Sequence, residues 1–308
     1  MTQGRIGLLS MIAACSIWGL SPLYYKLLSH IPPLEVLAHR TLWSAVFFTG
    51  LLAMRGRLGR VDATLRDRRA RRTLTFSALA ISANWFLFIY SIGIGRATEA
   101  SLGYYIFPLV AVLLGVALFG ERLSRVEAAA VALAGAAVAL LAWREGQVPY
   151  VSLLIAITFG LYGVAKKRIA ADAITSVTTE VLILCPLALV WLALVHAGAA
   201  PGQGGAFGSD AGTTVLLLFS GPLTALPLIF FSHASQRVAL GTLGLIQYMN
   251  PTLQFLCATL VFREPFGLAQ ALAFALIWTA LGLYSGARLS RDRASRRQST
   301  SAATDPQA

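Results

Sequence analysis

The chain has 308 residues, of which 57% are hydrophobic and 12% charged, with a mean hydropathy of +0.70. Soluble domains contain about 45–50% apolar and about 25% charged residues. Because the cores of one or two soluble domains could not bury so much apolar surface, the composition excludes secreted enzymes, cytosolic enzymes and soluble nucleic-acid-binding domains.

Ten apolar runs follow one another along the chain, each close to the roughly 20 residues that a bilayer-spanning helix needs. They lie at about residues 6–28, 34–54, 73–92, 99–119, 126–143, 149–166, 175–196, 212–232, 241–262 and 266–287. The first run is too long for the hydrophobic region of a signal peptide and lacks a small-x-small cleavage site. The sequence therefore predicts an all-α integral membrane protein with ten transmembrane helices.

The net charge of +12 comes from basic residues that gather in alternate loops. They are concentrated in the N-terminus, the 55–72 segment, the turns after the fourth, sixth and eighth runs, and the tail 288–308. The opposite set of loops holds only Arg96, Arg144 and Arg263. This bias predicts that both termini are cytoplasmic, and it explains the charge without a nucleic-acid partner. We expect the basic tail to be disordered.

The two halves of the chain resemble each other when the sequence is shifted against itself. The residues that superpose are Tyr105 on Tyr248, Pro108 on Pro251, Glu121 on Glu264 and, with a slightly different offset, Lys26 on Lys167. We predict two five-helix repeats, at residues 1–143 and 149–287. Because five is odd, the second repeat enters the membrane from the opposite side, and inverted repeats of this kind are a transporter architecture.

Several ionisable residues lie inside the predicted spans or at their edges, where an unpaired charge is costly. The predicted outer cluster contains Lys26, Glu35, His39, Arg40, Arg96 and Glu99, and the predicted inner cluster contains Lys167, Glu180, His233 and Arg237. We expect the two clusters to act as gates that break alternately. In the alternative interpretation, the two lysines extend to the lipid headgroups and the histidine serves only in packing.

A set of polar and aromatic residues lies at mid-depth in the predicted spans. It contains Trp18, Asn84, Trp85, Tyr104, Tyr105, Gln247, Tyr248 and Asn250. Pro108 and Pro251 follow these groups on repeat-related helices, and a proline kink is tolerated in a membrane where it lines a cavity. We expect the set to line a substrate pathway, although aromatic residues also commonly face lipid or pack in the interior.

Some of these residues stand in characteristic strings. The strings are Ile17-Trp18-Gly19, Glu35-x-x-x-His39-Arg40, Asn84-Trp85-x-x-Phe88-Ile89, Gly95-Arg96-x-x-Glu99 and Gln247-Tyr248-x-x-Pro251-Thr252. They resemble the RarD branch of the EamA transporters, in the drug/metabolite transporter superfamily. The resemblance covers residues 4–288, and Ile106-Phe107 departs from it where a more polar pair is expected.

The resemblance implies ten helices in two inverted EamA repeats, which surround a central cavity in a bacterial inner membrane. It also implies export or permeation of small metabolites or drugs, and the branch is associated by name with chloramphenicol sensitivity. The expected partners are membrane lipids and a small solute, which is amino-acid-like, an amine or a chloramphenicol-like drug. A homodimer stays open.

Two other classes of function compete with a secondary transporter. A passive channel or a structural membrane subunit stays open. An intramembrane enzyme is disfavoured, because the sequence has no Gly-x-Ser-x-Gly elbow and no His-Glu-x-x-His zinc helix. We therefore expect no enzymatic activity, no cofactor and no bound metal.

Reversing the charge at Arg40 tests its assignment to the outer cluster. We expect Arg40→Glu to abolish transport while the protein still reaches the membrane, because the substitution replaces a cation by an anion inside a span. Uptake is measured alongside membrane expression. Retained transport in this variant would contradict a gate role for Arg40.

Overall fold

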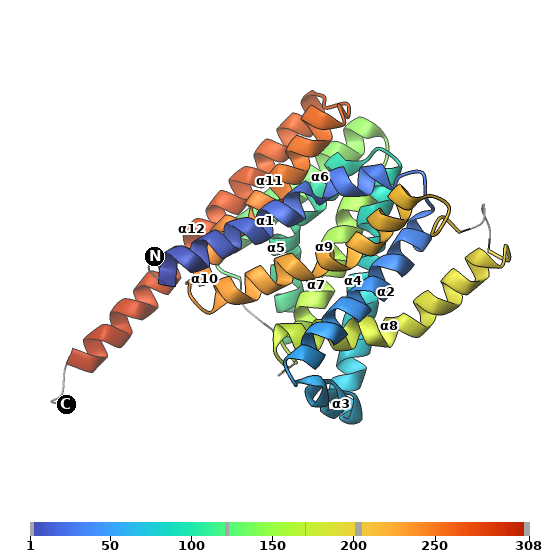
Figure 1. Cartoon of the computed structure of the whole chain (residues 1–308). Coiled ribbons are helices and arrows are strands. Elements are labelled where there is room, and N and C mark those ends of the chain that lie inside the picture. The colour runs from blue at the N-terminus through green and yellow to red at the C-terminus, as the bar shows by residue number, and fades with distance from the viewer. Residues whose placement is uncertain (1–2, 121–122, 170, 201–204, 239, 305–308) are drawn as a thin grey trace.

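The computed structural model describes residues 3–120, 123–169, 171–200, 205–238 and 240–304, and these residues form a bundle of helices (Figure 1). The helices are α1 (Gln3–Leu27), α2 (Pro33–Met54), α3 (Leu58–Arg66), α4 (Arg68–Gly93), α5 (Ala97–Phe119), α6 (Arg125–Glu145), α7 (Tyr150–Lys166), α8 (Ala173–His196), α9 (Ala211–Ser235), α10 (Leu240–Gln247), α11 (Met249–Leu256), the π-helical segment Cys257–Val261 and α12 (Leu268–Thr304). Glu121, which the sequence repeat pairs with Glu264, lies outside the described residues.

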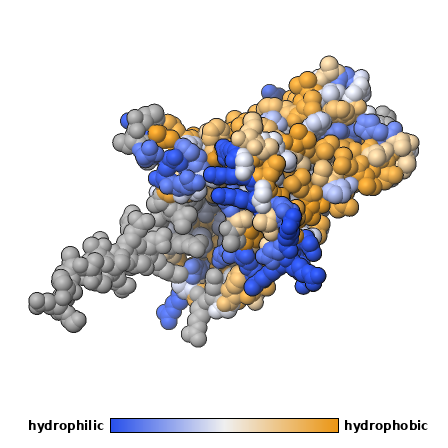
Figure 2. All heavy atoms as spheres, turned by 60° about the horizontal axis from the view of Figure 1, so that its bottom comes forward, coloured by the Kyte–Doolittle hydropathy of each residue, from blue (hydrophilic) through white to orange (hydrophobic). Residues whose placement is uncertain are grey.

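Eight of the described helices are long and apolar enough to cross a membrane. The apolar helix α7 is shorter, at 17 residues, and the predicted ninth span is divided among α10, α11 and the π-helical segment. Figure 2 shows a broad apolar surface beside which hydrophilic side chains gather on part of the face in view. Helices with satisfied backbone groups and an apolar exterior suit a lipid environment, so the predicted all-α membrane class is confirmed.

The two halves of the chain interleave. α2 packs against α8 and α9, α1 packs against α9 and α11, α7 packs against α4 and α5, and α6 packs against α12. We call the end of the bundle where α1 begins the terminal end, and the end where α1 finishes and α12 begins the distal end (Figure 1).

Helix α3 lies in the arginine-rich segment 55–72, where the apolar runs predict no helix. It buries Val61 and places Arg60 within 3.4 Å of Asp172, the residue that caps α8. Partial burial raises the pKa of the Asp172 carboxyl, but hydrogen bonds from Thr175 and Arg60 outweigh this effect and hold the pKa below its ordinary value. Asp172 is therefore ionised at neutral pH and attracts Arg60.

The tail differs from the expected disordered segment, because α12 continues as a helix to Thr304. Between Gly286 and Pro306 the sequence contains no proline or glycine. It is rich in arginine and alanine, which have high helix propensity. The expectation of disorder depends on the lack of an apolar run in the tail. A helix can nevertheless continue past the apolar part of α12 into a polar segment.

Two close contacts between the halves require glycine. A Cβ atom on Gly221 of α9 would lie 2.5 Å from the carbonyl oxygen of Trp43 on α2, and a Cβ on Gly103 of α5 would lie 2.7 Å from that of Ser152 on α7. Because both obstacles are backbone atoms, they cannot move aside as a flexible side chain could. Small residues at these positions let the helices approach closely, as is common inside membranes.

We expect Gly221→Ala to destabilise the protein by about 1–3 kcal/mol through overpacking of α9 on α2. The measurement is the free energy of unfolding in detergent. Gly135→Ala on α6 is the matched control, because nothing lies within 4 Å of its added Cβ. Equal stability of the two variants would contradict the contact.

Candidate functional site: a central cavity between the two halves

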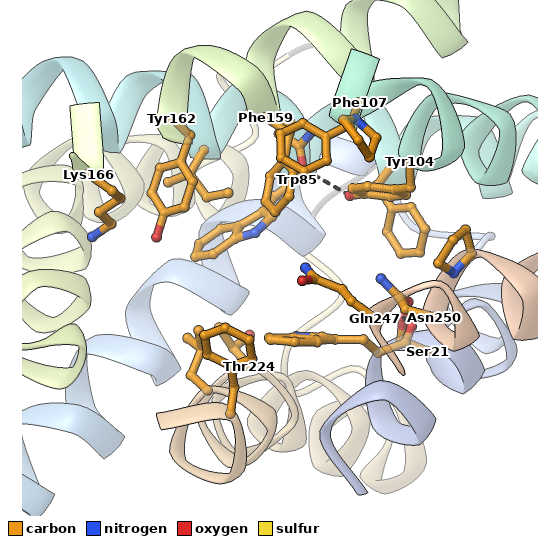
Figure 3. Close-up of a pocket in the computed structure, with 18 of the residues that line it drawn as sticks. Ser21, Trp85, Tyr104, Phe107, Phe159, Tyr162, Lys166, Thr224, Gln247 and Asn250 are labelled. Carbon is orange, nitrogen blue, oxygen red and sulfur yellow. Dashed lines mark hydrogen bonds between the residues drawn. The ribbon is translucent and has the colours of Figure 1, made fainter. Parts of the chain in front are cut away.

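A cavity of about 860 Å³ lies in the middle of the bundle (Figure 3). Its walls come from both halves of the chain, with residues from α1, α2, α4 and α5 facing residues from α7 to α12. Tyr25 and Arg40 line the part of the cavity nearer the distal end. Lys166, Ala171 and Ala173 line the part at the terminal end. The volume lies within the range of about 300–1,000 Å³ that is usual for small-molecule sites.

The structure brings most of the expected pathway residues together in this cavity. Those that line it are Trp18, Asn84, Trp85, Tyr104, Gln247, Tyr248 and Asn250. The side chain of Asn84 donates to the backbone oxygen of Ile155, and its Oδ1 accepts a hydrogen bond from the Tyr104 hydroxyl at 2.9 Å. These two residues are therefore held in place by α7.

Tyr105 lies elsewhere. Its side chain is buried outside the cavity lining, in edge-to-face contact with Phe274 and Trp278 of α12. Its hydroxyl lies 2.6 Å from Thr252 Oγ1. Because Tyr104 and Tyr105 are adjacent in a helix, they point in different directions, and only the first reaches the cavity.

The helix that the sequence predicts over 241–262 is interrupted between Gln247 and Met249. Pro251 follows the break, where it has no backbone N–H to donate to a carbonyl one turn earlier. Gln247 and Asn250 flank the break, and their amide groups project into the cavity (Figure 3). In contrast, α5 runs through Pro108 as one helix, with this proline also at the cavity wall.

Hydrogen bonds join the two halves of the chain at the distal end. The carboxylate of Glu264 accepts hydrogen bonds from the backbone N–H groups of Ala97 and Thr98 and from the Thr98 hydroxyl, all at 2.7 Å. The Tyr24 hydroxyl donates to the carbonyl of Leu216 at 2.6 Å. The N-terminus of α5 attracts the carboxylate both through its free N–H groups and through the helix dipole.

The predicted outer cluster does not form one network of ion pairs among the described residues. Arg96 pairs with Glu99 of its own helix at 3.3 Å, while Glu35 accepts a hydrogen bond from the backbone N–H of Ala206 at 2.6 Å. The ammonium of Lys26 lies 5.5 Å from the centre of the Phe262 ring. His39 is buried and stacks on Phe207 with ring centres 5.1 Å apart.

Arg40 has an unusual environment. Only 8% of this residue is exposed, and its guanidinium carbon lies 4.1 Å from the ring centre of Trp85 and 5.6 Å from that of Tyr25. Its Nε has no hydrogen-bond partner, and it takes part in no ion pair among the described residues. The charge is therefore stabilised by aromatic faces and not by a carboxylate.

At the terminal end the paired residues are Glu180 and Lys166. The Lys166 ammonium lies 2.6 Å from Glu180 Oε1 and also bonds to the hydroxyl of Ser176, while Ser77 donates to the same carboxylate oxygen at 2.5 Å. Only 2% of the Glu180 side chain is exposed. This buried pair connects α4, α7 and α8 beside the cavity.

The other members of the predicted inner cluster lie apart from this pair. Lys167 extends over the ring of Phe119 at 5.3 Å. His233 Nδ1 lies 3.0 Å from the Ser10 hydroxyl, and Arg237 donates to Gln3 Oε1 at 3.0 Å. His233 and Arg237 therefore bind the beginning of α1 to the end of α9.

The sequence analysis missed Lys166 and the aromatic residues Phe159 and Tyr162, which also line the cavity. A signal for them was present, because residues 159, 162 and 166 are spaced by three and four and share one helix face. The rings of Phe159 and Tyr162 are stacked with their centres 5.9 Å apart, and Figure 3 shows both at the cavity. Among the described residues, no group of three or more His, Cys, Asp or Glu side chains is placed to hold a metal ion.

Comparisons with known proteins agree with this architecture. The model of the EamA-like transporter family matches residues 5–143. An uncharacterized transporter, YojE of Bacillus subtilis, is 38% identical over 96% of this chain and 98% of its own. Protein RarD of Escherichia coli is 36% identical over 92% and 94%, and the chloramphenicol-sensitive protein RarD of Pseudomonas aeruginosa is 33% identical over 94% and 97%.

A solved crystal structure shares the fold, with a TM-score of 0.59 at 20% sequence identity over 90% of this chain and 96% of that one. The apolar helices and the bacterial transporter relatives define a multi-pass protein of the bacterial inner membrane, in the class of membrane transporters. The chain belongs to the EamA transporter family, and within it to the RarD branch.

Removing the charge of Glu180 tests the buried pair. We expect Glu180→Gln to lower the free energy of unfolding in detergent by about 3 kcal/mol, because Lys166 then lacks its counter-charge. Arg66→Gln is the control, since it removes a highly exposed pair with Asp62 and should cost less than about 1 kcal/mol. A loss in Glu180→Gln no larger than in the control would contradict the importance of the pair.

Proposed function

We propose that this chain is a secondary transporter that moves small organic metabolites or drugs across the bacterial inner membrane by alternating access. In this proposal ten spans form two inverted repeats, with both termini and the terminal end of the bundle on the cytoplasmic side. The distribution of lysine and arginine among the loops supports this orientation.

The observation that carries the proposal is a cavity lined by both halves of the chain, with contacts between the halves at its distal end. The cavity reaches the α7–α8 connection at the terminal end, while Glu264, Tyr24 and their partners bind the helices together at the other end. A carrier open to the cytoplasm has this arrangement. Inverted repeats provide a second arrangement, related to the first by a pseudo-two-fold rotation, with the opposite end open.

The repeat-related positions also support exchange between two such states. Arg40 is the eighth residue of α2 and Glu180 is the eighth residue of α8, so the two occupy equivalent places in the two halves. Both are buried, Arg40 in the cavity wall and Glu180 against the cavity-lining Lys166. In this proposal they mark the two places where the expected gates would open. We assign Lys166, Glu180 and Ser77 to the inner gate, in place of Lys167.

A passive channel is the second candidate. It would need a pathway that reaches both ends of the bundle, whereas the contacts of Glu264 with α5 obstruct the distal end. The polar lining of the cavity is compatible with both candidates, so kinetics must separate them.

Solute counterflow separates the two. Purified protein is placed in liposomes that are loaded with an unlabelled solute, and entry of labelled amino acids, amines, organic acids and chloramphenicol is followed. A carrier should accumulate one label transiently above its equilibrium level, because exchange of the trapped solute drives its entry. Liposomes without protein are the control, and protein-dependent entry without overshoot would favour the channel.

A further inference from the structure

Among the residues that the structure describes, one cation that lines the cavity has no counter-charge. Two basic residues line it, Arg40 near the distal end and Lys166 near the terminal end, and no aspartate or glutamate is among its described lining residues. The charge of Lys166 is balanced by Glu180, whereas Arg40 has no ion-pair partner among the residues that the structure describes. The electrostatic potential in the cavity therefore favours an anion.

The geometry at Arg40 favours one kind of anion. The rings of Trp85 and Tyr25 lie near the guanidinium and stabilise its charge, and the Tyr25 hydroxyl accepts a hydrogen bond from it. A guanidinium has five N–H donors, however, and one hydroxyl cannot satisfy them all. The buried Nε remains without an acceptor. A carboxylate can accept two parallel hydrogen bonds from such a planar group. Because a single unbalanced charge is available, a monoanion suits the site better than a dianion such as phosphate.

The rest of the cavity suits an apolar, planar body. Aromatic side chains from both halves of the chain surround it, among them Trp18, Trp85, Tyr104, Phe107, Phe159 and Tyr162. Figure 3 shows Trp85, Phe159 and Tyr162 gathered on one side of the space, with the amides of Gln247 and Asn250 on the other. Rings bind a flat apolar solute by stacking, while a few amides fix its orientation.

We propose that the solute is an aromatic or similarly apolar monocarboxylate, whose carboxylate binds Arg40 and whose body lies among the aromatic side chains. This inference rests on the transport function proposed above and names the substrate class of the same cavity. It sets organic acids ahead of amines, because a cationic amine would be repelled by Arg40.

A charge series on one molecular frame tests the proposal. Indole-3-acetate, indole-3-acetamide and tryptamine present the same ring with a carboxylate, a neutral amide and an ammonium group near neutral pH. We measure their binding to the purified protein by isothermal titration calorimetry and their exchange by counterflow. The acetate should bind about tenfold or more tightly than the amide, a difference expected for a charge-assisted hydrogen-bonded pair. Tryptamine should bind most weakly.

Variants at Arg40 test whether this residue causes the tighter binding of the acetate than of the amide. Arg40→Gln should lose the difference between acetate and amide, and Arg40→Lys should keep only part of it, because the lysine retains the charge without the planar fork. Arg144→Gln is the matched control, since this arginine is exposed at the end of α6 and lies outside the cavity. The Arg144→Gln variant should bind the acetate more tightly than the amide by the same factor as the unmodified protein.

The outcomes are distinguishable. If the amide or the amine binds to the unmodified protein as well as the acetate does, the substrate class is wrong, whether or not Arg40→Gln folds. Counterflow of amines alone would likewise overturn the substrate class and leave the transporter proposal standing. A third outcome is that the acetate binds but its protein-dependent entry never exceeds the equilibrium level. This result would support the anion site and contradict alternating access.

Discussion

A side chain that carries charge inside a bilayer needs a counter-charge or a polarisable neighbour, because the hydrocarbon offers no water to solvate it. The two halves of this transporter meet that requirement differently at equivalent positions. In α8 the carboxylate of Glu180 is paired with Lys166 and bound by Ser77. In α2 the guanidinium of Arg40 lies against the rings of Trp85 and Tyr25 and hydrogen-bonds the Tyr25 hydroxyl, with no carboxylate paired to it among the described residues. This difference gives the cavity an electrostatic polarity, with an unbalanced positive charge at Arg40 and a balanced pair at Lys166.

The shape of the cavity depends on a second constraint, which is that backbone groups in a membrane must be satisfied within the protein. The break before Met249 is tolerated because it faces the cavity and not lipid, and the N–H of Thr252 finds the carbonyl of Tyr248 beyond it. At the distal end, the free N–H groups at the start of α5 are taken up by Glu264. Helix ends and interruptions therefore lie where the pathway must open or close.

The positions of the long helices could be predicted from the sequence because apolar runs record directly which segments contact lipid. Helix α3 could not, since it is short and arginine-rich and depends on neighbours such as Asp172. The candidate site divides similarly. Residue type placed Asn84, Tyr104 and Gln247 near the pathway, but successive residues on a helix differ by about 100° in direction. That rotation separates Tyr104 from Tyr105 and Lys166 from Lys167. The repeat in the sequence is weak and its offset varies, so it could not show which residue of each adjacent pair faces the cavity.

The interleaving of the two halves has a consequence for how such a protein arose. α2 lies against α8 and α9 of the other half, and the segment after Gly205 binds it through Glu35 and through a ring stacked on His39. Neither half therefore encloses a core of its own. Under the proposed origin from two inverted repeats, an ancestral five-helix unit would have had to assemble with an antiparallel copy of itself before it could bury these faces. Fusion into one chain would then have allowed the two copies to diverge, so that one could keep a cation where the other carries an acid.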